Sequence, residues 1–371
     1  ATAALVATAA PAFAQSGFSV AADATVGYSS NPFLVGGPET GSGYANATIR
    51  PRYDHETARG VTSLFGTYSR SEYFRRYAHA DGYSVDLTHN QQLTEKLSVN
   101  AGVGYNSSLT SLSDPIDITT GAFRQRRKTF HANGGLAYRS DSRSTWTAGA
   151  GYQHARYPST NPLLALNYDQ YDGNIGYRRA VSETLELGVR LSALHYESDT
   201  GLDSDVLTPA FTFIKRFSDR LTLDGSVGMM FRKSHGGGLP DDKFTGLAAG
   251  LNLCDATSRG NLCLHGRRDS SATGLGELRT VNEVGVDYSY RVSERDTVTL
   301  NGLYSRSTGR SVLVGNRIEY ASLGGRYAHD LNERMTVSAG ASYRWRDLHN
   351  TVSADDISGD VTLTVRLGAR R

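Results

Sequence analysis

Residues 216–231 read RFSDRLTLDGSVGMMF, a charged turn followed by a run that alternates between two faces. The odd positions from 221 to 231 carry Leu, Leu, Gly, Val, Met and Phe, whereas the even positions from 222 to 232 carry Thr, Asp, Ser, Gly, Met and Arg. A period of two residues is that of a β-strand whose two faces meet different surroundings. The question that decides the fold is which surroundings require one apolar face over about ten residues, ending in an aromatic side chain.

The same module of a turn and a strand recurs along the chain. Copies are QLTEKLSVNAGVGY (92–105), AVSETLELGVRL (180–191), RVSERDTVTLNGLY (291–304) and DLNERMTVSAGASY (330–343). Their irregular spacing disfavours a solenoid or a propeller of fixed period. Working outward from these turns, we expect 16–18 strands, an even number that returns both termini to one side. The eighteen segments lie near 18–28, 43–54, 60–72, 77–89, 96–108, 124–139, 144–154, 167–179, 184–196, 204–217, 220–232, 243–254, 261–271, 279–291, 297–307, 317–328, 335–347 and 356–368.

The composition excludes several other classes of protein. The 371 residues include 40 Gly and 21 Tyr, and the mean hydropathy is −0.40. No apolar run of the length of a membrane helix occurs, and no apolar stripe repeats with the helical period of 3.6. The charges nearly balance, with 39 Lys and Arg against 37 Asp and Glu, so nothing supports a nucleic-acid partner.

Aromatic residues mark both ends of the alternating runs. Strands that leave a short turn end in residues such as Tyr105 and Tyr152, and strands that enter one carry residues such as Tyr138 and Tyr177. Amphipathic rings favour the boundary between hydrocarbon and water. The expected strands of about 11–14 residues are also longer than the usual 5–6, which disfavours the alternative of a soluble β-sandwich. We therefore predict an all-β fold, a transmembrane antiparallel up-and-down β-barrel, with outer-membrane lipid against its apolar face.

The first residues predict export. ATAALVATAAPAFA (1–14) is a small-residue apolar run that ends in the cleavage pattern Ala12-Phe13-Ala14, and a short structural strand is the alternative. We interpret residues 1–14 as a residual signal peptide and residues 15–371 as a single outer-membrane β-barrel domain. An exported chain meets an oxidising compartment.

Two cysteines lie in NLCDATSRGNLCL (252–264). Their spacing is poor for a metal site. Cys254 and Cys263 fall on the same face of facing strands across a short turn, so we predict a disulfide between them. Free buried thiols are the alternative.

If the apolar face meets lipid, the opposite face lines the barrel interior. That face carries the pore-lining candidates Arg50, Arg52, His131, Arg178, Arg190, Arg232, Arg326, Arg344 and Arg346. Two interpretations stay open: arginine–carboxylate ladders that hold the wall, or the lining of a water path with a mild anion preference. An interior this wide needs water or a plug, and the connection 109–123 is a candidate plug or an external loop.

Enzymatic chemistry has little support in the sequence. No HExxH, GxSxG or P-loop pattern occurs. His131 or His195 could act with Asp172 or Glu186 in a barrel-embedded hydrolase, but nothing places them near a nucleophile. We expect no enzyme, no cofactor and no metal.

Short motifs resemble one family of barrels. The hexapeptide at residues 28–33, Tyr-Ser-Ser-Asn-Pro-Phe, resembles the Y-x-x-N-P/V-F stretch near the start of proteins of the β-barrel porin 2 family. That family repeats a turn similar to LSExLxL, which occurs here as VSETLEL (181–187), FSDRLTL (217–223) and VSERDTV (292–298). The resemblance covers about residues 17–368. The chain departs from the usual aromatic end of such barrels, because it ends in LGARR (367–371).

The resemblance implies an outer-membrane protein of a Gram-negative bacterium, associated with exopolysaccharide production, and implies no catalytic residue. We expect a channel that supports exopolysaccharide export, with polysaccharide or periplasmic export machinery as partners. The alternatives are a general or weakly anion-selective diffusion porin and a closed structural barrel.

Overall fold

The computed structural model describes residues 15–35, 41–109, 126–158, 167–199, 201–236, 241–273, 277–309, 317–348 and 352–368. These residues form eighteen strands and no helix. Among them, no helix is long and apolar enough to cross a membrane. The expected residual signal peptide, residues 1–14, and residues 110–123 of the candidate plug lie outside the described residues.

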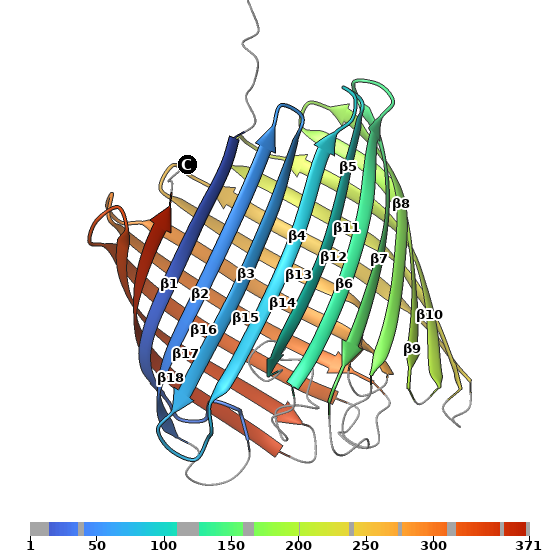
Figure 1. The fold of residues 1–371 in the computed structure, drawn as a ribbon. Helices are drawn as coiled ribbons and strands as arrows, with labels where there is room; N and C mark the ends of the chain where they lie inside the picture. The colour runs from blue at the N-terminus through green and yellow to red at the C-terminus, as the bar shows by residue number, and fades with distance from the viewer. Residues whose placement is uncertain are drawn as a thin grey trace, which may run out of the picture.

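The strands follow one another around a single closed sheet (Figure 1). Each strand pairs antiparallel with the strands before and after it in the sequence, which confirms the predicted up-and-down barrel. The strands are β1 (Gln15–Ser29), β2 (Ser42–Thr57), β3 (Gly60–Tyr73), β4 (Ala80–Gln92), β5 (Leu97–Leu109), β6 (Arg126–Arg139), β7 (Ser144–Arg156), β8 (Tyr168–Ser182), β9 (Leu185–Ser198), β10 (Leu202–Arg216), β11 (Leu221–Gly236), β12 (Asp242–Ala256), β13 (Gly260–Thr273), β14 (Glu277–Arg291), β15 (Asp296–Thr308), β16 (Arg317–Asp330), β17 (Met335–Leu348) and β18 (Val352–Gly368).

One ladder joins the two ends of the chain and closes the barrel. β1 pairs with β18 from Ser19 opposite Gly368 to Ser29 opposite Ser358, while its other edge pairs with β2. Each strand therefore has a neighbour on both edges, as the hydrocarbon interior of a bilayer requires of backbone N–H and C=O groups.

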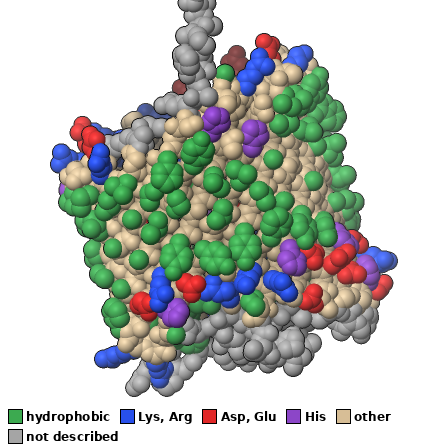
Figure 2. All heavy atoms as spheres, viewed as in Figure 1, with side chains coloured by type: hydrophobic (Ala, Val, Ile, Leu, Met, Phe, Trp, Pro, Cys, Tyr) green, Lys and Arg blue, Asp and Glu red, His purple; other side chains and the backbone are tan. Residues whose placement is uncertain are grey.

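The register gives every strand one apolar face and one polar face. On β1 and β2, Val26 and Ile49 point outward and are 60% and 49% exposed, whereas Asp23 and Arg50 point into the lumen. Figure 2 shows the result, a broad band of hydrophobic side chains across the outer wall with charged side chains toward its edges. This outward band answers the question raised by residues 216–231, because its surroundings are lipid.

Aromatic rings form ring contacts on the outer wall near both ends of the strands. Toward the long loops, neighbouring strands bring Tyr83 to Tyr105, at 5.9 Å between ring centroids, and Tyr152 to Tyr171, at 5.1 Å. Toward the short turns, Trp146 and Tyr177 lie 4.8 Å apart. These positions agree with the boundary level that the sequence pattern indicated.

The repeated turn motif has one hydrogen-bond pattern. In the turn between β10 and β11, the N–H of Phe217 donates to the C=O of Leu221, and the Ser218 hydroxyl accepts from the N–H groups of Arg220 and Leu221. In three other turns, a side-chain oxygen accepts from two backbone N–H groups in the same way, that of Thr94, Ser293 or Asn332. Side-chain acceptors therefore satisfy the backbone donors that a tight turn leaves unpaired. The short turns lie at the same end of the barrel as the start of β1 and the end of β18 (Figure 1).

The predicted disulfide is confirmed. Cys254 and Cys263 are direct partners across the β12–β13 hairpin, with 4.1 Å between their Cα atoms and a bond between their sulfurs. The pair lies on the lumen side of the hairpin, next to its turn.

We predict that replacing both cysteines with serine will loosen this turn and leave the barrel closed. A disulfide that closes so short a loop contributes about 2–3 kcal/mol in the chain-entropy model, whereas the closed ladder involves all eighteen strands. Urea unfolding of the reconstituted barrel measures the loss, and thiol titration of denatured, unreduced wild-type protein should find no free thiol. Two free thiols in that titration would contradict the bond.

Candidate functional site

All nine pore-lining candidates lie on strand positions that face the lumen. Arg50 and Arg52 lie on β2, His131 on β6, Arg178 on β8, Arg190 on β9, Arg232 on β11, Arg326 on β16, and Arg344 and Arg346 on β17. Each alternates with exposed apolar residues of the outer wall, such as Ile49 beside Arg50 and Val189 beside Arg190. Their surroundings divide them into three groups: paired across the wall, unpaired, and buried at the loop end.

The first group forms charge pairs that lie flat on the lumen wall. Arg50 meets Asp23 at 2.7 Å, and Arg52 meets Asp54 at 2.8 Å. Arg326 on β16 reaches across β17 and places one guanidinium nitrogen 2.7 and 2.9 Å from the two oxygens of Asp360 on β18. These contacts are arginine–carboxylate pairs of the kind that the first interpretation describes. The Arg50–Asp23 pair joins β2 to β1, the Arg326–Asp360 pair joins β16 to β18, and the Arg52–Asp54 pair lies within β2.

Glycines of the lumen face make room for such pairs. A Cβ at Gly340, on β17, would lie 2.9 Å from a guanidinium nitrogen of Arg326, directly under the bond to Asp360. Gly104 on β5 also makes room for a pair. Above it, the side chains of Asp86 on β4 and His131 on β6 approach to 3.3 Å. A side chain at either glycine would separate the two paired groups.

The second group, Arg178 and Arg190, has no carboxylate partner among the described residues. Both residues line a niche of about 200 Å³ in the wall, together with Asn174, Thr212 and Asp224. Positive charge therefore stays available to the lumen on β8 and β9, as the second interpretation expects. The paired arginines correspond to the first interpretation, and Arg178 and Arg190 are the residues to which the second interpretation applies.

The third group, Arg344 and Arg346, anchors a loop segment at the mouth of the barrel. The segment from Asn31 to Val35 turns inward after β1, and the side chain of Asn31 bonds both the N–H and the C=O of Val35. Arg346 donates to the C=O of Leu34 at 2.6 Å and is only 5% exposed. Arg346 therefore faces the lumen side but holds the loop instead of lining open water.

Asp356 is the centre of this anchor. Its fully buried carboxylate accepts hydrogen bonds from the Ser29 hydroxyl at 2.6 Å, from the backbone N–H of Asn31 at 2.8 Å and from Arg344 at 2.6 Å. Sequence reasoning missed this residue, although it lies opposite Arg344 on the lumen side of β18. The alternation of β18 together with the register of β17 was the signal that could have identified it.

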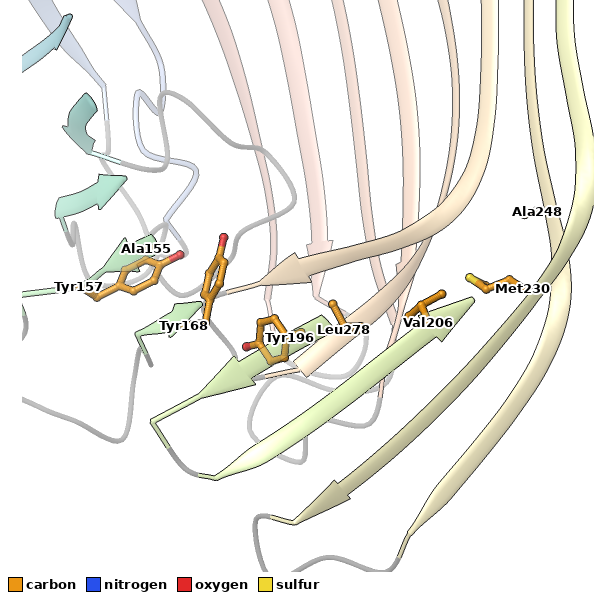
Figure 3. Packing of buried hydrophobic residues seen from close by; sticks show 8 residues of the cluster. All are labelled: Ala155, Tyr157, Tyr168, Tyr196, Val206, Met230, Ala248 and Leu278. Atoms are coloured by element: carbon orange, nitrogen blue, oxygen red, sulfur yellow. The ribbon is translucent and has the colours of Figure 1, made fainter. Parts of the chain in front are cut away.

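A second segment, the β13–β14 hairpin, also reaches into the mouth. The tip of β13 and β14 folds over the inner wall, where Leu278 packs with Val206 and Met230 and lies between Tyr196 and Val206 in Figure 3. Arg232 donates to the C=O of Leu278 at 2.9 Å. Arg232 is thus a second anchor, since its side chain is only 9% exposed.

The wall beside the segment from Asn31 to Val35 carries aromatic and hydroxyl groups, and Phe33 of this segment is itself fully buried. Phe33 packs against Tyr77 at 4.8 Å and Tyr73 at 5.3 Å between centroids. A niche of about 370 Å³ lies below, lined by Thr25, Ser29, Pro32, Tyr44, Asn46, Ser71, Tyr73, Arg326, Ser342, Arg344, Ser358, Asp360 and Thr362. The mouth therefore presents rings, hydroxyls, an amide and paired charges to whatever enters it.

The two histidines considered for catalysis have other neighbours. His131 meets Asp86 in the lumen, and His195 lies on the outer wall, between Asp205 at 2.7 Å and Glu197 at 2.8 Å. Neither forms an ion pair with Asp172 or Glu186. The register puts His195 on the opposite face of the wall from those two carboxylates, and His131 lies on β6, whereas Asp172 and Glu186 lie on β8 and β9.

These features define the class: a closed antiparallel barrel with a lipid-facing apolar band and a polar lumen is an outer-membrane β-barrel. Solved structures agree on the fold. Pseudomonas aeruginosa OccK2 (OpdF) is 12% identical with a TM-score of 0.51, covering 96% of this chain and 98% of that one. The outer membrane protein OpdK of Pseudomonas aeruginosa is 9% identical with a TM-score of 0.50, covering 96% and 99%.

A variant of the FrpB iron transporter of Neisseria meningitidis is also similar, at 8% identity and a TM-score of 0.50, covering 94% of this chain and 82% of that one. No family model matches the sequence, and no curated protein matches it. At such low identities the likeness concerns the fold.

We predict that Gly340→Val will push Arg326 away from Asp360 and lower the free energy of unfolding by about 1 kcal/mol, the range of a charge-assisted hydrogen bond that is partly exposed. Gly359→Val is the matched control on the next strand. A Cβ there would point outward, with its nearest neighbour at 3.7 Å. Urea unfolding of the two variants in lipid vesicles compares them, and equal losses would show that the space at Gly340 is not needed for the pair.

We predict that Asp356→Ala will release the segment from Asn31 to Val35 and raise the single-channel conductance. The variant leaves Arg344 without its carboxylate and should cost about 3 kcal/mol of stability, as removal of one partner of a buried ion pair does. Asp355→Ala is the control, because Asp355 is exposed on the outer face of the same strand. An unchanged conductance in Asp356→Ala would mean that this segment does not narrow the path.

Proposed function

We propose that this protein is a water-containing channel of the outer membrane that supports the export of an exopolysaccharide. A barrel of eighteen strands is too wide for its own side chains to fill. Its lumen carries paired and unpaired charges, hydroxyls and amides, a lining suited to a hydrated solute.

The observation that carries the proposal is the set of aromatic and polar side chains at the mouth of the barrel. Sugar hydroxyls need donors and acceptors placed close together, and the C–H faces of sugar rings pack on aromatic rings. The niche of about 370 Å³ offers both, through Tyr44 and Tyr73 beside Asn46, Arg326 and Asp360. Pockets with an aromatic wall and a few oriented polar groups are the usual form of small-ligand sites.

The resemblance to the β-barrel porin 2 family supports the same proposal. The hexapeptide that carries it, residues 28–33, includes Asn31 and Phe33, which help to build the narrowed mouth. In this proposal the polymer is the partner in the lumen, and periplasmic export machinery meets the barrel at the end with the short turns.

A second candidate function rests on a different observation. Arg178 and Arg190 lack carboxylate partners within the described part of the wall, which favours a weakly anion-selective diffusion porin. The two functions predict different currents. Oligosaccharides should block the current through a channel for a sugar polymer. A weakly anion-selective diffusion porin should instead show a reversal potential that favours anions.

Planar-bilayer recordings with neutral linear oligosaccharides of increasing length test the first function. We expect transient block whose duration grows with chain length, and Tyr44→Ala with Tyr73→Ala should shorten it about tenfold. Tyr53→Ala is the control, because Tyr53 lies on β2 with Tyr44 but points outward.

Conductance without block would overturn the export proposal. In that case a reversal potential that favours anions, and that Arg178→Gln with Arg190→Gln abolishes, would identify the diffusion porin. Arg306→Gln is the control for these variants, because Arg306 is exposed on the outer face of β15. A barrel without conductance would be a closed structural barrel.

A further inference from the structure

The outer wall is hollowed near the loop ends of β8 to β12. The hollow measures about 620 Å³. Two cross-strand rows of outward residues line it. The row nearer the membrane centre contains Gly173, Ala193, Leu207, Phe231 and Thr245, and the row nearer the loops contains Tyr171, His195, Asp205, Lys233 and Lys243.

Small residues and a proline explain why the wall is hollow here. Gly173 lies directly opposite Ala193, so two neighbouring outward positions carry almost no side chain. The pairing of β10 with β11 skips Thr208 and Pro209, as expected because proline has no N–H to donate. The wall therefore lacks both side-chain bulk and a continuous ladder at this place.

A second hollow continues the first toward the short turns. It measures about 650 Å³, and its lining includes Ile175, Leu191, Pro209, Phe211 and Met229. Leu191 and Pro209 are two residues along their strands from Ala193 and Leu207 of the first hollow. The two hollows form a trough, apolar along its length and charged at its loop end.

The charged end contains two lysines that form no ion pair with any described residue. Lys233 and Lys243 lie directly opposite each other on β11 and β12, an arrangement that destabilises a sheet. Asp205 lies opposite Lys233 on the other side, yet its carboxylate binds His195 at 2.7 Å. Within the described ranges, no carboxylate oxygen lies within 4.0 Å of either ammonium.

A second pair of the same kind lies on the other side of the trough, on β6 and β7. Lys128 and Arg156 are direct partners on the outer faces of β6 and β7, again without an ion pair inside the described segments. Figure 2 shows charged side chains gathered along the loop-end edge of the outer wall. Opposed cations at the boundary of a bilayer call for a multivalent anion between them.

We propose that the trough binds a phosphate-bearing lipid of the outer leaflet. The ammonium groups of Lys233 and Lys243 hold the phosphate, and an acyl chain fills the trough over Ala193 and Pro209. Phosphate suits this place because it accepts hydrogen bonds from both ammonium groups at once. The acyl chain gains close packing in the hollow. The bilayer around it is hydrocarbon too, so dispersion is the force that favours the hollow over the bilayer. The site requires only that the barrel spans a membrane, and it is independent of what passes through the lumen.

The test uses the full-length barrel purified in a neutral detergent, with three probes: lipid A carrying its phosphates, the same lipid A after phosphatase treatment, and inorganic phosphate. Native mass spectrometry and a binding titration follow each probe. We expect one tightly bound phosphorylated lipid A, with at least tenfold weaker binding of the dephosphorylated lipid and no measurable binding of inorganic phosphate.

Two variants separate the parts of the site. The double variant Lys233→Ala with Lys243→Ala should weaken the binding of phosphorylated lipid A at least tenfold. Without lipid, this variant should be at least as resistant to urea as the wild type, because the repulsion between the two ammonium groups is removed. Ala193→Phe fills the trough and should weaken the same lipid while the lysines remain. Lys96→Ala with Lys215→Ala, at the end with the short turns, is the matched control and should bind as the wild type does.

Three results would overturn the proposal. Equal binding of the dephosphorylated lipid would mean that the trough holds ordinary boundary lipid. Binding of inorganic phosphate as tight as that of the lipid would mean that the acyl chain does not contribute to binding. Undiminished lipid binding in the double lysine variant, with its barrel shown to be folded by circular dichroism, would place the phosphate elsewhere.

Discussion

The ladder between β1 and β18 is the constraint on which the rest of the structure depends. A strand in hydrocarbon cannot leave backbone N–H and C=O groups unpaired, so eighteen strands are stable there only as a closed ring. Every other ladder joins strands that are neighbours in the sequence, and a short turn or a loop is enough to form it. The closing ladder joins the two ends of the chain, and it turns a sheet with two open edges into a wall with an inside and an outside.

Closure also explains the chemistry of the inner face. Charged side chains cannot point to lipid at the level of the apolar band, so they gather inside, where water and opposite charges compensate them. The long reach of arginine lets Arg326 cross a whole strand to Asp360, and Gly340 supplies the space for that crossing. The high glycine content is thus partly a consequence of the polar lumen.

The arginines near the loops have a different part from those deeper in the lumen. Arg232, Arg344 and Arg346 bind backbone carbonyls of segments that fold into the mouth. A carbonyl accepts readily from a guanidinium group, so one buried cation holds a loop that has little apolar surface of its own. The same residue type therefore supports the wall at one height and narrows the path at another.

The sequence by itself determined the barrel, the number of its strands to within two, the inward face of the charged residues on its strands and the partner of Cys254, because alternation and turn chemistry are local properties of the chain. Residues such as Arg50 and Arg190 could be assigned to the lumen from parity alone. Only the tertiary structure decided which arginines meet a carboxylate, that Asp356 anchors residues more than three hundred positions away, and that the β13–β14 hairpin folds over Val206 and Met230. Those contacts depend on register, on strand tilt and on closure, which bring distant segments together at distances that no local pattern encodes.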